Sequence, residues 1–477
     1  MRKAIVVGSG AAGMSCAVKV AQQGANVLLV SPFPSERSQS VMAAGGINAV
    51  LSGHEAGDSV EAHIEDTLKG GGNLAGKNAV TGLCEDAENI IHYLESIGTI
   101  FSKDETGRFS RRGVGGASFK RTCYSGSATG KQIVSALVME VRRLEAAGLI
   151  ERRLGSFFHS ALIQDGVCFG ALFCDSISGE LTAEYADALV MATGGQNVLF
   201  GKTTGSTLCD GYAAGKLFLQ GAELKNLEFI QYHPTTLETL QKKILISEAV
   251  RGEGGRLFYL ENGKRVYFME EKYGTKGNLE TRDVVSREIF NLGKEVFLDV
   301  SFLKKQVINE KIPEVRDLCR KYRNIDIVKH PIPVTPSVHF FMGGLAVHNS
   351  HETNIQNLYA IGECASIYHG ANRLGGNSLL AAIHGAWIAA NEIVSKTSLG
   401  KAPDFTAYLE DEKRELLHFA EAESSFPPVY IKDMVAKVMN QELGIVRSEE
   451  MLKQGISDID YYLSVSDKIR YDSSIRH

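Results

Sequence analysis

The chain has 477 residues, of which 44% are hydrophobic and 22% charged, the balance of a globular protein of two or three domains. Its net charge of −5 argues against binding to nucleic acid or to an anionic membrane, so basic groups that hold an acidic substrate must be local. No apolar run approaches the ~20 residues that cross a bilayer, so we expect no direct membrane span.

The eight cysteines form no C-x-x-C pair, which disfavours a zinc site, an iron–sulfur cluster and a disulfide framework. We therefore expect reduced thiols, no metal site and a cytoplasmic protein, in contact with a membrane only through a partner. The first residues could pass for a signal peptide, but the motif inside them predicts that they are part of the fold.

That motif is a glycine-rich turn at 8–13, between a predicted buried strand at 4–7 and a predicted helix at 14–23. A second strand is predicted at 27–30, which gives the turn the context of a dinucleotide-binding βαβ unit. Its glycines let the turn close, let the backbone approach a pyrophosphate and let helix and strand pack, while the helix N-terminus faces the phosphates. The second strand ends in Ser31, where an acid that binds ribose is usual, so NAD is disfavoured. The residues assigned to this unit are Gly8, Gly10, Ala11, Ala12, Gly13 and Ser31.

Further strands recur along the chain and indicate a split domain. An apolar run at 186–192 leads into Thr193-Gly194-Gly195, and another at 357–361 leads into Gly362-Glu363, before a predicted helix at 378–393. We therefore predict an α/β fold: a split Rossmann-like domain over 1–230 and 345–400, an inserted α+β capping domain over 231–344, and a helical C-terminal segment over 403–477. The pattern stops in mid-course at residue 477, so we expect either a reduced helical tail or a truncated one.

Several longer motifs occur in one order along the chain and together resemble a known family. That family is the flavoprotein subunit of succinate dehydrogenase and fumarate reductase, which also contains L-aspartate oxidase. The resemblance is strong over about 1–400 and weak over 403–477, and the closest likeness is to fumarate reductase. Its markers are Gly45-Gly46-Ile47, Arg121-Thr122-Cys123-Tyr124, Ala128-Thr129-Gly130, Gln231-Tyr232-His233-Pro234-Thr235, the run 247–255, Arg282-Asp283-Val284-Val285, and the runs 339–344 and 369–378.

The resemblance implies a bound FAD and hydride transfer between flavin N5 and a C4 dicarboxylate, from fumarate to succinate or the reverse. The FAD contacts that it implies are Gly8, Gly10, Gly13, Ser31, Gly45, Gly46, Thr193, Gly194, Asp210, Glu363, Asn377, Ser378 and Leu379. For the substrate it implies that Arg373 clamps one carboxylate, a task that suits the planar guanidinium fork. His339 would bind the other carboxylate, with His233 and Ser247 nearby.

By the same resemblance, Arg282 donates a proton in reduction or accepts one in oxidation. An arginine has a pKa above ~12 and is a poor acid unless a relay restores its proton. Glu248 and Arg251 are three residues apart and share a face if the segment is helical, so they can form that relay.

Two departures from the family pattern carry information. The family's covalent flavin link uses a histidine in an Arg-Ser-His motif, whereas this chain has Gln39 there, so we expect non-covalent FAD with a lowered potential that leaves fumarate reduction feasible. Aspartate oxidases place a glutamate before a Gly-Gly pair to offset the substrate ammonium, whereas this chain has Val114, which leaves that charge unbalanced. The segments 46–50 and 65–68 nevertheless look more like aspartate oxidase, so that activity remains the alternative.

Two other functional interpretations are disfavoured by the sequence. An NAD dehydrogenase is disfavoured by Ser31, and a flavin-bound assembly subunit without turnover is disfavoured by the complete set of catalytic residues. A reductase needs electrons, which we expect from an iron–sulfur protein, a free flavin or another soluble donor.

Overall fold

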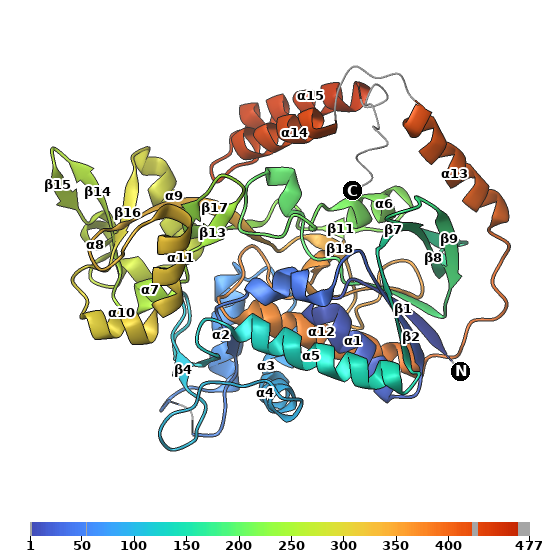
Figure 1. Ribbon diagram of the computed structural model, residues 1–477, viewed down its shortest axis with the longest axis horizontal. Helices are drawn as coiled ribbons and strands as arrows, with labels where there is room; N and C mark the ends of the chain where they lie inside the picture. The colour runs from blue at the N-terminus through green and yellow to red at the C-terminus, as the bar shows by residue number, and fades with distance from the viewer. Residues whose placement is uncertain (1, 54, 422–427, 466–477) are drawn as a thin grey trace.

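The computed structural model describes residues 2–53, 55–421 and 428–465. Its central element is a parallel sheet of five strands in the order β19-β10-β1-β2-β6 (Figure 1). β1 lies in the middle, with Ala4 paired to Val27 on one side and to Ala188 on the other. The strands are β1 (Lys3–Val7), β2 (Asn26–Ser31), β6 (Ile150–Leu154), β10 (Ala188–Met191) and β19 (Leu358–Ala360).

Both faces of this sheet are covered, as expected for a parallel sheet. Ala4 and Val6 of β1 pack with the helices of one face, while Ile5 and Val7 point into a second apolar cluster on the other. The helices on the first face are α1 (Ala11–Gln22), α5 (Thr129–Ala146) and α12 (Asn377–Ser395), with α2 (Val60–Gly70), α3 (Lys77–Glu85) and α4 (Ala87–Ser96) around them. The helix expected at 14–23 begins three residues earlier, because Gly10 is its N-cap.

The second face is covered by an antiparallel sheet and one helix. These are β7 (Ser156–Gln164), β8 (Val167–Asp175), β9 (Leu181–Tyr185) and α6 (Tyr212–Leu219). Two small sheets complete this part: β3 (Ile47–Asn48), β5 (Thr122–Cys123) and β4 (Arg111–Arg112), and β11 (Leu224–Lys225), β18 (Gly344–Ala346) and β20 (Ala365–Ser366). The predicted α/β class with a parallel Rossmann-like sheet is confirmed.

The segment between β11 and β18 builds a separate six-stranded sheet with its own apolar core. In sheet order its strands are β13 (Lys243–Leu245), β12 (Ile230–Glu238), β17 (Ile332–Phe341), β16 (Val296–Asp299), β14 (Arg256–Glu261) and β15 (Lys264–Val266). Its helices are α7 (Ala249–Gly252), α8 (Phe268–Tyr273), α9 (Arg282–Leu292), α10 (Lys305–Lys311) and α11 (Pro313–Arg323). The chain then returns to the central sheet, where Leu358 pairs with Leu189. From this pairing we propose a dinucleotide-binding domain over 1–230 and 345–400 and a capping domain over 231–344.

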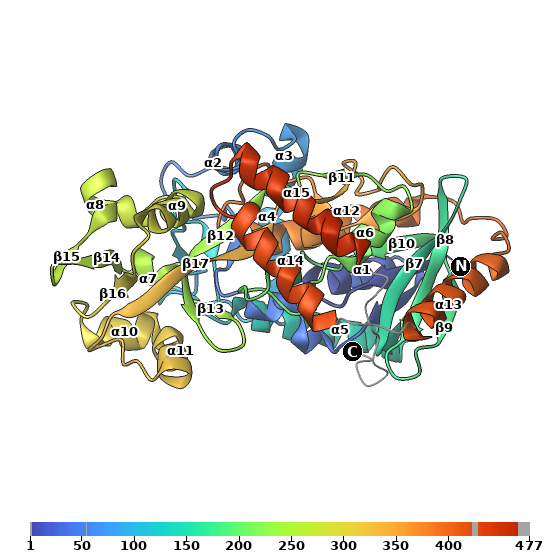
Figure 2. The same ribbon diagram turned by 90° about the horizontal axis from the view of Figure 1, so that it is seen from above.

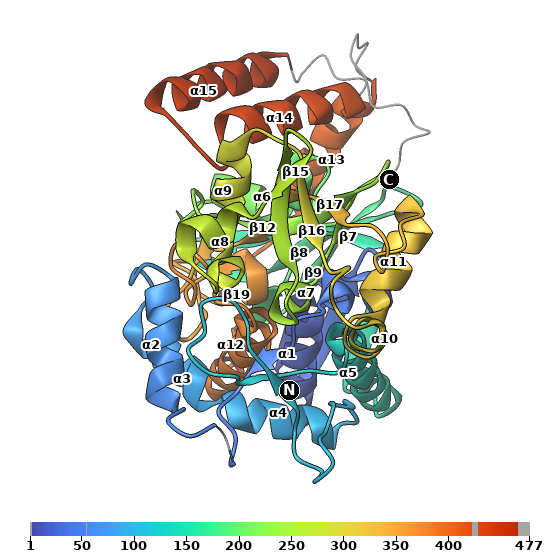
Figure 3. The same ribbon diagram turned by 90° about the vertical axis from the view of Figure 1, so that its left-hand side faces the viewer.

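The C-terminal segment contributes α13 (Thr406–Glu421), α14 (Pro428–Glu442) and α15 (Glu449–Ser464). α13 lies beside β9 (Figure 2). α14 and α15 form an antiparallel pair at the end of the molecule opposite α4 (Figure 3). α14 is anchored where Asn440 donates to the carbonyl of Phe200 at 2.9 Å. The parts of the predicted helical tail at 422–427 and 466–477 lie outside the described residues. Among the helices that the structure describes, none is long and apolar enough to cross a membrane.

Candidate active site

A cavity of about 580 Å³ lies at the carboxyl ends of the central strands. Its walls combine the turns after β1, β2, β10 and β19 with the β12–β13 hairpin and β17 of the inserted segment. Ligands of doubly wound α/β folds bind at this edge of the sheet.

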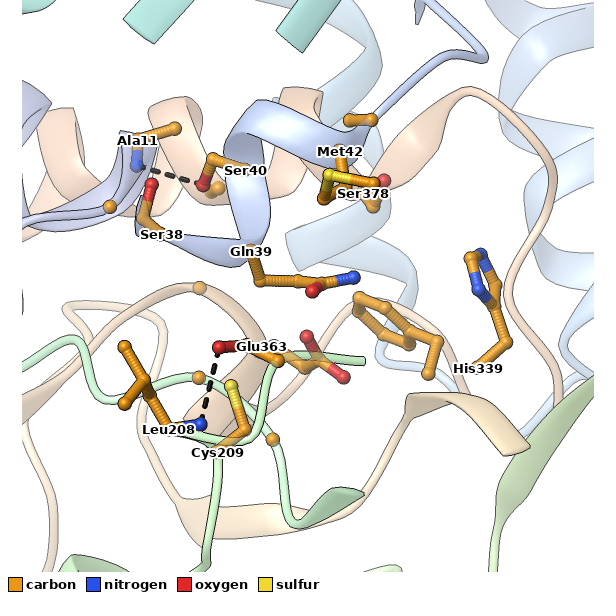
Figure 4. Close-up of a pocket in the computed structure, with 18 of the residues that line it drawn as sticks. Ala11, Ser38, Gln39, Ser40, Met42, Leu208, Cys209, His339, Glu363 and Ser378 are labelled. Atoms are coloured by element: carbon orange, nitrogen blue, oxygen red, sulfur yellow. Dashed lines mark hydrogen bonds between the residues drawn. The ribbon is translucent and has the colours of Figure 1, made fainter. Parts of the chain in front are cut away.

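One end of the cavity is built to admit a dinucleotide backbone. A Cβ on Gly13 would lie 1.8 Å from the carbonyl oxygen of Gly8, so only glycine lets α1 pack onto the turn. Gly8 itself has a φ of +107°, a conformation that favours glycine. The N-terminal amide of α1, on Ala11, donates to Ser40 Oγ at 3.0 Å (Figure 4). The helix N-terminus therefore faces the cavity as an anion-binding end.

Most residues predicted to contact FAD line this cavity. They are Gly8, Gly10, Ala11, Ala12, Ser31, Gly45, Gly46, Thr193, Gly194, Asp210, Glu363, Ser378 and Leu379. Gly13 and Asn377 do not line it. The Asn377 side chain instead bonds to Asn48 and Thr67 beneath the wall, at 2.8 and 2.9 Å, where it orients the start of α12.

Gln39, at the position of the family's flavin-linking histidine, projects into the same cavity between Ser378 and Glu363 (Figure 4). Its Oε1 is buried and has no hydrogen-bond partner among the described residues. Because buried polar groups are normally hydrogen-bonded, this amide oxygen can accept a hydrogen bond from a ligand in the cavity. The glycine cradle and this amide fit a bound FAD.

The predicted substrate residues His233, Ser247, His339 and Arg373 line the cavity too. The rings of His233 and His339 lie 5.2 Å apart in an edge-to-face arrangement. His339 Nδ1 lies 2.8 Å from Thr204 Oγ1, and the Arg373 guanidinium lies 4.5 Å above the Phe340 ring. These contacts hold His233, His339 and Arg373 in place.

Glu248 lies between two arginines. It precedes α7, and its Oε1 accepts from Arg251 Nη2 at 3.0 Å while its Oε2 accepts from Arg282 Nη2 at 2.9 Å. Arg251 lies outside the cavity wall, is buried, and also donates to the carbonyl of Asn278 at 2.6 Å. The three side chains form a continuous hydrogen-bonded chain that ends at the cavity.

Burial and charge shape the ionisation of this cluster. Burial opposes the charge of Glu248, but Arg282 and Arg251 outweigh it and lower the pKa of that carboxyl to about 2. Burial, reinforced by Arg282, holds the pKa values of His233 and His339 well below their ordinary value, so both are neutral at pH 7. Burial and the charge of Arg282 also lower the pKa of Arg373 to about 9.

The role of Gln231 was missed in the sequence. Its Oε1 accepts from Arg282 Nη1 and from Arg373 Nη2, both at 2.9 Å. Its Nε2 donates at 2.7 Å to the carbonyl of Arg373, which fixes the amide orientation. One neutral amide thus holds two guanidinium groups side by side. Gln231 belongs to one of the family motifs. Its position in that motif does not predict that its side chain contacts Arg282 and Arg373, which lie 51 and 142 positions away.

Arg112 was also missed. It lines the cavity, donates to the carbonyls of Ala44 and Gly45, and lies 4.3 Å from the Tyr124 ring. It therefore fixes the loop that carries Gly45 and Gly46. No pattern in the sequence distinguished it from its neighbour Arg111.

Comparison with known proteins places this arrangement in a family. Residues 3–379 match the family model described as an FAD binding domain. The chain is 38% identical over 455 residues to the succinate dehydrogenase flavoprotein subunit of Bacillus subtilis, covering 92% of this chain and 77% of that protein. It is 36% identical over 391 residues to the L-aspartate oxidase of Clostridium perfringens, covering 80% of this chain and 83% of that protein. The structure also matches the FrdA chain of E. coli quinol fumarate reductase with a TM-score of 0.92 and 28% identity, covering 99% of this chain and 85% of that one.

The chain belongs to the succinate dehydrogenase/fumarate reductase flavoprotein family. As a member of this flavoprotein family, it is an FAD-dependent oxidoreductase. The family assignment made from the sequence motifs is confirmed, and L-aspartate oxidase is among the relatives as expected.

Proposed function

We propose that this flavoprotein transfers a hydride between flavin N5 and a C4 dicarboxylate, with fumarate reduction to succinate as the favoured direction. The observation that carries the proposal is the chain Arg251–Glu248–Arg282, which reaches the cavity beside Arg373 and the His233–His339 pair. This arrangement supplies two carboxylate-binding positions and a group that moves a proton.

Bound FAD supplies the hydride. Arg373 binds one carboxylate and His339 the other, assisted by His233 and Ser247. The neutral histidines donate hydrogen bonds without adding charge. Arg282 delivers the proton to the carbon that does not receive the hydride, and Glu248 returns a proton to Arg282 from Arg251. Since Glu248 bonds to both arginines, the relay requires no side-chain rearrangement between proton transfers.

The flavin is held without a covalent bond, because an amide at Gln39 cannot form the histidyl link. Its contacts come from the lining residues of the α1 end, from Glu363 and from the start of α12. Electrons reach it from a partner, either an iron–sulfur protein or another soluble donor. The relative from B. subtilis is named as a subunit, which supports a partner protein.

L-aspartate oxidation to iminoaspartate is the second candidate, supported by the similarity to the C. perfringens enzyme. Val114 favours the reductase instead, because it presents an apolar wall to the cavity, where an ammonium group would need an anion.

An anaerobic experiment in two halves separates the two candidates. The bound flavin is reduced chemically and mixed with fumarate, and L-aspartate is added separately to the oxidised protein. Rapid reoxidation by fumarate with succinate formed, and no bleaching by aspartate, supports the dicarboxylate reductase. Bleaching by aspartate identifies an amino-acid oxidase.

A further inference from the structure

The charge of the cavity is opposite in sign to that of the chain. Six cationic side chains line the cavity against three anionic ones, whereas the whole chain has a net charge of −5. Two of the cations, Arg282 and Arg373, belong to the proposed substrate site, and Arg112 holds a loop. The remaining three are Lys242, Lys243 and Lys432, to which neither the sequence motifs nor the family resemblance gives a role.

These lysines come from two elements that each contact the segment 201–204. Lys242 precedes β13 and Lys243 opens it, whereas Lys432 lies on α14. The segment 201–204 joins both elements to the site. A Cβ on Gly201 would lie 3.2 Å from the Cβ of Ala436, one turn beyond Lys432.

The same segment reaches β13 and the substrate residues. The Lys243 amide donates to the carbonyl of Thr203 at 3.2 Å, and the next residue, Thr204, contacts His339. Lys242 and Lys243 therefore lie beside the substrate residues, and Lys432 lines the same cavity from α14.

The three amino groups carry charge that the protein does not neutralise. Among the residues that the structure describes, none of the three forms an ion pair, and Lys243 donates only to the carbonyl of Pro336 at 3.3 Å. The charge of Glu238 raises the pKa of Lys243, and the charge of Lys202 lowers it. Burial lowers the pKa of both Lys242 and Lys243, which shows that part of their hydration is already lost. Lys242 and Lys243 are half-buried and Lys432 is exposed, so their positive charge is available to an anion that enters the cavity.

We propose that Lys242, Lys243 and Lys432 form a lysine entrance that attracts a dianionic dicarboxylate and guides it to the substrate site. This inference rests on the proposed dicarboxylate activity. The long-range field of a chain with a charge of −5 repels a dianion, so capture depends on a local field of opposite sign. Such fields raise association rates by about 10- to 1,000-fold and weaken with salt, because the Debye length is only ~10 Å at 0.1 M. The C-terminal helix pair, through Lys432, then contributes to substrate capture as well as to the fold.

The test compares two triple variants of the FAD-loaded enzyme. K242Q/K243Q/K432Q removes the entrance, and K77Q/K401Q/K437Q removes three exposed lysines outside the cavity with the same change in net charge. We expect the entrance variant to keep its kcat and FAD content while its kcat/KM for fumarate falls about tenfold at low ionic strength. That difference should vanish at about 0.5 M salt, where charges are screened, and the control should match the unmodified enzyme throughout.

An entrance variant that matches the control at every salt concentration overturns the inference, as does a loss confined to kcat. Loss of FAD from the entrance variant also overturns it, because the lysines would then hold the flavin. If that variant does not fold, the unmodified enzyme decides: its kcat/KM must fall as salt rises, and a flat profile refutes the entrance. Failure of the unmodified enzyme to turn over fumarate refutes the proposed function itself, which separates the two results.

Discussion

Replacing Glu248 by glutamine tests the proton relay most directly. The substitution keeps the shape of the side chain but removes the charge that joins Arg251 to Arg282. The pKa of Glu248 lies at about 2, against an ordinary 4.5, which corresponds to about 3 kcal/mol of stabilisation of the charged form. We therefore expect the variant to be less stable by up to about 3 kcal/mol at pH 7, a free energy of unfolding measurable by denaturant titration.

The substitution should lower kcat more than it changes KM. Loss of the relay should lower kcat by about 10²- to 10⁴-fold, the usual contribution of a positioned acid or base. KM should not rise, because the removal of the anion beside Arg282 strengthens the positive field that attracts the dicarboxylate. Stopped-flow reoxidation of the reduced flavin by fumarate measures the chemical step, and steady-state kinetics give KM. Glu253→Gln, an exposed glutamate on the following turn, is the matched control.

The relay is refuted if Glu248→Gln keeps kcat within about threefold of the unmodified enzyme. It is also refuted if the whole loss appears in KM, since that pattern belongs to substrate binding.

Other predictions address the remaining side chains. Arg282→Ala should abolish turnover while FAD stays bound, as measured by the flavin absorbance of the purified variant; near-normal activity would show that another group donates the proton. Arg373 is cationic below its pKa of about 9 and neutral above it, so kcat/KM should decline above about pH 9, and a constant value up to pH 10.5 would contradict its role as the carboxylate clamp. Acid precipitation should release all of the flavin into the supernatant because Gln39 forms no link, whereas colour in the pellet would reveal a covalent bond. Val114→Glu should allow L-aspartate to bleach the oxidised flavin under anaerobic conditions, and an unresponsive variant would remove Val114 as the residue that excludes ammonium.

The fold was predictable because the sequence signals for it are local. The glycine turn, the strand runs into Thr193 and Gly362, and the helix after 377 each follow from neighbouring residues. The strands of the central sheet and helix α12 confirm them. The predicted start of α1 is wrong, because the glycine pattern assigns Ala11 and Ala12 to the turn whereas the helix begins at Ala11. A helix N-terminus that faces a ligand continues directly from its glycine cap, and no polar N-cap side chain marks it.

The site was only partly predictable, because its decisive contacts join residues far apart in the chain. Glu248 and Arg251 were paired from their spacing, but Gln231 and Arg112 act through neighbours more than 50 positions away. The identity of such neighbours depends on how the inserted segment and the C-terminal helices pack against the sheet. A motif identifies a residue, but the contacts of its side chain depend on the tertiary structure.

The order of the strands has a consequence for biogenesis. β1 is synthesised first, but its neighbour β10 follows about 180 residues later and β19 another 170 later, with the whole inserted segment between them. The inserted segment has a core of its own and can assemble while the ribosome still holds the strand and helix that close the flavin site. Chains released before α12 therefore lack one wall of the cofactor cavity, so FAD loading should be one of the last steps of maturation.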